Sequence, residues 1–118
     1  INPATKLIDP ESNRAGDAKN WTIAANYAVT VNKTSGVTVY TTTAYGTSFA
    51  APFVTGSAAL LMEWGIVRGN DPYLYGEKVK AYLRKGAKQL AGYERWPNAL
   101  LGYGALCVRD SLPGLGSS

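Results

Sequence analysis

The sequence predicts an α/β fold, because strand-like and helix-like segments follow one another within its 118 residues. Residues 22–31 and 37–43 are rich in threonine, valine and tyrosine, which is the composition of β-strands. A long apolar helix is expected directly after them, over residues 48–64, and a shorter amphipathic helix over residues 75–85. An apolar content of 46% with 17% charged residues is typical of a globular chain.

The first half of the chain supplies the strands. Residues 1–20 are polar and rich in turn formers, so we expect little regular structure there. Residues 32–36 form the expected turn that joins the two strands into a hairpin. The helix over 48–64 is apolar on nearly every side, which predicts burial on all sides. Pro52 cannot donate to the carbonyl of Ser48, so the first turn should be distorted, and Gly65 is the expected helix end.

The second half is predicted to close the core. In the helix over 75–85, Val79, Tyr82 and Leu83 share the inner face, and Gly86 follows the helix end. Residues 101–108 have the pattern of a tight turn that leads into a short buried strand containing Cys107. Residues 113–118 are expected to be a flexible tail.

Composition excludes several classes of function. The single cysteine and the absence of histidine rule out an intrachain disulfide, a Cys/His dyad and the usual zinc sites, so we expect no metal and no cofactor. The net charge of +4 comes from basic residues that cluster only between 78 and 88, where a solvated helix face is a better explanation than a nucleic-acid surface. The alternative of a basic RNA-binding or membrane-surface module has this charge as its only support.

Membrane insertion and secretion signals are likewise not expected from the residues present. The helix over 48–64 is short for a membrane span and is interrupted by Pro52 and Glu63. The first residues show neither a starting methionine nor an apolar signal segment, so we expect a chain that begins within a longer protein or has been processed.

Ser48 is the candidate functional residue. It follows Gly46 and Thr47 at the expected start of the long helix, where unpaired backbone N–H groups and positive partial charge can stabilise an oxyanion. The commoner role of a serine there is to cap the helix. A lipase-type nucleophile turn would need glycine at residue 50, which is alanine here.

The stretch over residues 46–56 reads Gly-Thr-Ser-Phe-Ala-Ala-Pro-Phe-Val-Thr-Gly and closely resembles the nucleophile motif of subtilisin-like serine proteases, the subtilases. Residues 52–72 are similar to bacterial subtilases of the clostridial group, which include the Csp-type germination proteases. Residues 102–106 resemble the family's terminal Gly-x-Gly strand. The resemblance implies that residues 1–118 are the C-terminal portion of a single subtilase catalytic domain with a three-layer α/β/α fold.

The resemblance also implies a serine endopeptidase that cleaves protein or peptide substrates through an acyl-enzyme on Ser48. The Ser48 N–H would be an oxyanion donor, and Gly46 and Thr47 would support the turn. The histidine and aspartate of the triad precede the serine in this family and lie outside this chain. The missing N-terminal part of the domain, whether another chain or a pro-peptide, is therefore an expected partner, and the chain alone should be inactive.

A non-catalytic pseudoprotease, or a protein-interaction module on a subtilase scaffold, is the alternative. Residues 19–28 lack the Ala-Pro-Gly turn that the family usually carries before its serine, and Phe53 replaces a histidine often found after the proline of the motif. By resemblance, we expect a secreted protein, or one associated with the spore or cell envelope of a bacterium.

Overall fold

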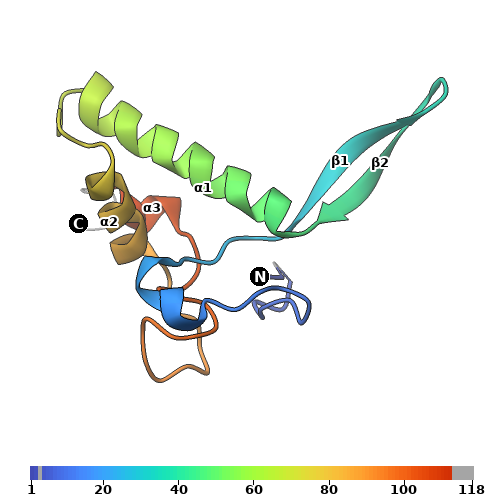
Figure 1. Cartoon of the computed structure of the whole chain (residues 1–118). Helices are drawn as coiled ribbons and strands as arrows, with labels where there is room; N and C mark the ends of the chain where they lie inside the picture. The colour runs from blue at the N-terminus through green and yellow to red at the C-terminus, as the bar shows by residue number, and fades with distance from the viewer. Residues whose placement is uncertain (3, 113–118) are drawn as a thin grey trace.

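The computed structural model describes residues 1–2 and 4–112, and it contains both helices and strands, in agreement with the predicted α/β class (Figure 1). The helix η1 precedes an antiparallel strand pair, and the helices α1, η2, α2 and α3 follow. In chain order the elements are η1 (Gly16–Trp21), β1 (Ala28–Ser35), β2 (Thr38–Tyr45), α1 (Thr47–Met62), η2 (Glu63–Val67), α2 (Glu77–Gly86) and α3 (Val108–Ser111).

The predicted hairpin is present, with shifted ends. Ala28 pairs with Tyr45 at its base and Ser35 with Thr38 at its tip, so the turn is shorter than the predicted 32–36. A two-residue turn suffices because Gly36 adopts a φ of +61°, which few other residues tolerate. The ribbon extends away from the rest of the chain in Figure 1. The predicted start of the first strand at residue 22 is wrong, because residues 22–27 lie outside the hairpin.

Residues 22–24 pair instead with the segment near the end of the chain. Ala24 forms a parallel bridge with Ala105, which also forms an antiparallel bridge with Lys88. Gly102 and Gly104 allow this pairing, because a Cβ on either would strike the carbonyl oxygen of Thr22 or of Lys88. The predicted strand over 101–108 is thus only a short paired segment, and α3 begins at Val108.

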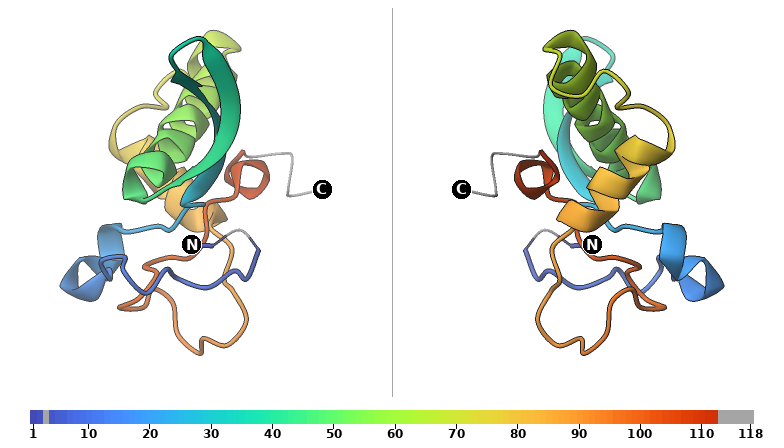
Figure 2. Two further views of the ribbon diagram at one scale, coloured as in Figure 1. Left: turned by 90° about the vertical axis from the view of Figure 1, so that its right-hand side faces the viewer. Right: turned by 90° about the vertical axis from the view of Figure 1, so that its left-hand side faces the viewer.

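The core lies between α1 and α2, where Leu61, Leu74, Val79 and Leu83 form one buried cluster. The prediction that α1 is buried on all sides is wrong for this chain, because only Ser57 and Leu61 of that helix are buried. α2 and the loop before it cover one side of α1, and Figure 2 shows α2 beside that helix. Most residues of α1 remain exposed. Apolar side chains that stay exposed on α1 include Phe53, Leu60 and Met62.

The helical path of α1 continues through η2, which is a π-helix, so the predicted end at Gly65 is wrong. Gly65 is needed for a different reason: a Cβ there would lie 2.6 Å from Leu74 Cδ2 and 2.9 Å from the Asp71 carbonyl oxygen. Thr47–Val67 spans 21 residues and is long and apolar enough to cross a membrane by length and composition, with 17% of its most apolar window buried. The helical segment therefore extends beyond the predicted range of 48–64.

Near the C-terminus, the prediction for α2 is largely confirmed. Val79 and Leu83 are buried, Tyr82 is half-buried, and Lys78, Lys80 and Lys85 are exposed. Arg84 departs from the predicted solvated helix face, because its side chain is only 22% exposed and its guanidinium lies 6.0 Å from the centroid of the Tyr103 ring. Gly86 is the last residue of the helix and packs against Ser111, whose backbone nitrogen would lie 2.5 Å from a Cβ. Cys107 is half-buried and precedes α3, so it is less enclosed than predicted. The predicted flexible tail, residues 113–118, lies outside the described residues.

Candidate active site

The turn before Ser48 is fixed by hydrogen bonds of Gly46. Its N–H donates to the Tyr27 carbonyl oxygen at 2.8 Å, and its own carbonyl accepts the N–H groups of Phe49 at 3.0 Å and Ala50 at 3.3 Å. Gly46 has φ 137° and ψ 170°, a conformation that side chains make costly. The chain therefore turns sharply from β2 into α1 at a residue without a Cβ, and Ser48 lies in the first turn of the helix.

Ser48 occupies an open position at the positive end of α1. Its side chain is exposed, and among the described residues neither its Oγ nor its N–H has a hydrogen-bond partner. The Thr47 N–H likewise has no hydrogen-bond partner among the described residues. No acidic residue lies in the first turn to neutralise the helix end. The alternative role of Ser48 as a helix cap is thus not seen, and two backbone N–H groups at the helix start have no partner among the described residues.

The side chains around Ser48 include no general base of the histidine type, because the chain contains no histidine. Within residues 1–2 and 4–112, no three histidine, cysteine, aspartate or glutamate side chains gather to hold a metal ion. A serine–histidine pair at Ser48 would therefore need a histidine from outside these 118 residues.

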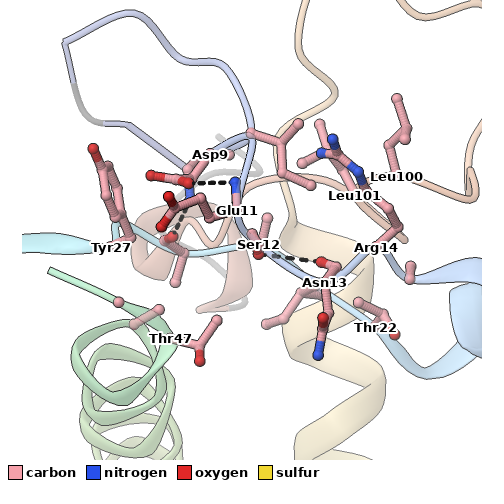
Figure 3. Close-up of a pocket in the computed structure, with 18 of the residues that line it drawn as sticks. Asp9, Glu11, Ser12, Asn13, Arg14, Thr22, Tyr27, Thr47, Leu100 and Leu101 are labelled. Carbon is pink, nitrogen blue, oxygen red and sulfur yellow. Dashed lines mark hydrogen bonds between the residues drawn. The ribbon is translucent and has the colours of Figure 1, made fainter.

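A hollow of about 640 Å³ adjoins the serine turn and includes Gly46, Thr47 and Ala50 in its wall. The N-terminal segment forms another wall, with Asp9, Glu11 and Arg14 lining the space (Figure 3). Sequence reasoning missed this second wall, because residues 1–20 carry no periodic pattern that indicates what they pack against.

Comparison with known proteins places the chain in a family. The model described as the Subtilase family matches residues 4–104. A solved structure, that of the CspB protease of Clostridium perfringens, shares 46% sequence identity with the chain and superimposes with a TM-score of 0.61. The alignment covers 75% of this chain and 19% of that chain, so the match spans about a fifth of the length of the protease. No curated protein matches the chain.

These likenesses agree with the sequence motif around Ser48 and with the partial α/β domain seen here. The predicted membership of a subtilisin-like family and the predicted fold class are confirmed. The position of Ser48 in the first turn of α1, after a glycine-dependent turn, falls within the matched residues. The chain belongs to the subtilase family.

Proposed function

We propose that this chain supplies the nucleophile of a serine endopeptidase, with Ser48 Oγ attacking the scissile carbonyl of a protein or peptide substrate. The observation that carries the proposal is the exposed Ser48 beside two unpaired N–H groups, on a segment that matches the subtilase family. A histidine would remove the Oγ proton and return it to the leaving amine, and water would then hydrolyse the acyl-enzyme. Gly46 and Thr47 hold the turn.

The Ser48 N–H supports the attack electrostatically. Negative charge develops on the carbonyl oxygen in the tetrahedral intermediate, and a fixed donor at a helix N-terminus stabilises that charge without reorganising. Loss of a single oxyanion donor in such sites costs about 10²–10³-fold in rate. The hydrogen bond between Gly46 and Tyr27 holds the backbone that presents this donor.

The histidine and its orienting aspartate would come from the missing N-terminal part of the protease domain, supplied as another segment or chain. Helical spacing places Ser48 at the head of a stripe formed by Pro52, Thr55, Ala59 and Met62, and every residue of this stripe is exposed. A polypeptide that covered the stripe would also reach Ser48. Docking of the partner and completion of the triad would then be one event, and the chain alone would be inactive.

Labelling with a fluorophosphonate tests the nucleophile. We expect modification of Ser48 in the full-length protein, no modification in the Ser48→Ala variant, and neither labelling nor peptide hydrolysis in the isolated 118 residues. Ser57 is the internal control on the same helix, because it is buried and its Oγ donates to the Phe53 carbonyl at 2.7 Å. Peptide mapping would show which serine carries the phosphonate.

A pseudoprotease or interaction module is the second candidate, and the open apolar side of α1 favours it. Large exposed apolar surfaces mark binding sites for other proteins. A folded full-length protein that binds its partner through α1 but leaves Ser48 unlabelled would establish this candidate and reject the endopeptidase. Insertion of α1 and η2 into neutral lipid vesicles would reject both, since the 21 residues of Thr47–Val67 are also long enough for a membrane span. We also propose, by resemblance, that the protein is secreted or associated with the spore or cell envelope of a bacterium.

A further inference from the structure

The hollow beside the serine turn has one end whose chemistry suits a cation. Asp9 and Glu11 bring two carboxylates to its wall, and Figure 3 shows both on the same side as Tyr27. Tyr45 lines the hollow as well, with its ring centroid 6.0 Å from that of Tyr27. Aromatic faces attract cations and stack well on the planar guanidinium group of arginine.

One cation, the terminal ammonium of Ile1, also lines the hollow and interacts electrostatically with Asp9. Asp9 Oδ1 accepts the Glu11 N–H at 2.7 Å, and no ion pair within 4.0 Å joins either carboxylate to a cation of the described residues. Among the described residues of the wall, Arg14 has the one cationic side chain, and Figure 3 shows it on the opposite side, toward Leu100 and Leu101. The end near Tyr27 therefore presents two carboxyl groups and the single ammonium of Ile1.

The hollow also lies within reach of a substrate held at Ser48. Thr47 and Ala50, two residues of its wall, stand one and two positions from the serine in the first turn of α1. An extended peptide advances about 3.3 Å per residue, so side chains one or two positions from the scissile bond stand only a few ångströms from the attacked carbonyl. A long side chain at such a position can enter the space.

We propose that this hollow is a substrate subsite that accepts an arginine side chain, or less tightly a lysine, from a residue within about two positions of the scissile bond. The proposal depends on the proposed role of Ser48 for its place in the reaction. The guanidinium group lies between the carboxylates of Asp9 and Glu11 and against the tyrosine rings, while the aliphatic part of the side chain fills the hollow. Substrates with an acidic residue at that position are repelled.

Peptide binding tests the subsite without any need for turnover. The full-length protein carrying Ser48→Ala is titrated with a capped hexapeptide containing one arginine, and with matched peptides containing norleucine or glutamate in its place. We expect the arginine peptide to bind roughly tenfold more tightly than the glutamate peptide at low ionic strength, with the difference shrinking as salt is added. A peptide with lysine in the same position should bind with an affinity between those of the arginine and norleucine peptides.

Variants assign the preference to the hollow. The double substitution Asp9→Asn with Glu11→Gln should remove most of the arginine preference and leave norleucine binding unchanged. The matched control Glu94→Gln with Asp110→Asn removes the same charge from exposed residues that do not line the hollow, and it should keep the preference. Arg14→Gln should strengthen arginine binding several-fold, because it removes a like charge from the wall. This third variant remains informative even if the double variant folds poorly.

The outcomes separate the subsite from the nucleophile. Equal binding of the arginine, norleucine and glutamate peptides would overturn the subsite even if Ser48 is labelled. An arginine preference that survives the Asp9 and Glu11 substitutions in folded protein would overturn it as well. An arginine preference that depends on Asp9 and Glu11, in a protein whose Ser48 never reacts, would retain the hollow as a binding site for basic peptides and reject the endopeptidase. If both proposals hold, the arginine peptide slows fluorophosphonate labelling of Ser48.

Discussion

The amide nitrogen of Gly46 lies 2.8 Å from the carbonyl oxygen of Tyr27, so the turn that presents Ser48 is bonded directly to the residue before β1. Tyr27 also lines the hollow beside the serine. One hydrogen bond therefore connects the candidate nucleophile with the wall of the candidate subsite. Changes at this turn are expected to affect reactivity and peptide binding together.

Substitution of Gly46 by alanine should lower reactivity at Ser48. The φ of 137° is a conformation in which a Cβ costs about 1–3 kcal/mol of strain, although no atom would crowd the new methyl group. We expect the variant to lose a similar amount of stability or to relax the turn and misplace the Ser48 N–H. Urea denaturation and the rate of fluorophosphonate labelling measure the two effects. A variant with wild-type values for both would contradict the geometry of this turn.

Two glycines of the long helix should respond to alanine in opposite directions. Gly65→Ala places a methyl group against Leu74 and the Asp71 carbonyl, and overpacking of this kind costs about 1–3 kcal/mol. Gly56→Ala meets no atom within 4 Å and should stabilise the described chain by about 0.5–1 kcal/mol, because alanine favours a helix. Thermal unfolding of the two variants under the same conditions makes the comparison. Equal effects would show that Gly65 does not pack as described.

Leu61 and Leu60 are adjacent on α1 and differ sharply in burial. Leu61 is fully buried in the cluster with Leu74, so Leu61→Ala should destabilise by about 2–5 kcal/mol. Leu60 is 54% exposed, and Leu60→Ala should cost well under half as much in the chain alone. Chemical denaturation gives both values. A larger loss at Leu60 than at Leu61 would reverse the assignment of the inner and outer sides of α1.

The side of α1 that faces the core could be predicted less well than the existence of the helix. The apolar run over 48–64 fixes a helix, but its residues are apolar on all sides, so periodicity could not choose between Leu60 and Leu61. The choice is made by tertiary packing, because α2 and its preceding loop cover one side only. The amphipathic pattern of α2, in contrast, was sufficient to identify Val79 and Leu83 as buried.

The glycines were harder to interpret from sequence than the helices. Gly65 and Gly86 were expected to end helices, whereas both are required because Leu74 and Ser111 approach their backbones closely. Such approaches join residues distant in sequence and leave no local signal. Ser48 could be located through its motif, but the hollow beside it could not, because it depends on how residues 1–20 fold back onto the turn.

Asp71 and Lys78 make stability depend on pH at both ends of the scale. Lys78 Nζ lies 2.6 Å from Asp71 Oδ2, and this hydrogen bond lowers the pKa of Asp71 and raises the pKa of Lys78. The contribution of Asp71 to the free energy of unfolding is complete when the pH is above its unfolded-state pKa of about 4. This contribution is lost as the pH falls through the lower folded-state pKa. The contribution of Lys78 to the free energy of unfolding is complete when the pH is below its unfolded-state pKa of about 10. It is lost as the pH rises through the higher folded-state pKa.

The Asp71→Asn variant isolates this contribution. Its urea midpoint should lie below that of the wild type between about pH 5 and 9, and the two midpoints should converge in acid, where the wild-type carboxylate is protonated. Glu77→Gln serves as the control, because Glu77 is far more exposed in its pair with Lys80. A wild-type advantage that persisted undiminished at pH 2 would show that the ion pair is not its source.

Pro52 has a consequence for the exchange of backbone hydrogens around the nucleophile. It has no N–H, so the Ser48 carbonyl oxygen never receives the hydrogen bond that an ordinary residue four positions later would supply. The first turn of α1 is therefore held by fewer bonds than the turns around Leu61, and its amides should take up deuterium sooner. The serine is thus carried on a turn with fewer backbone hydrogen bonds than the middle of its helix, and occupation by a substrate or a partner should be visible there as slowed deuterium uptake.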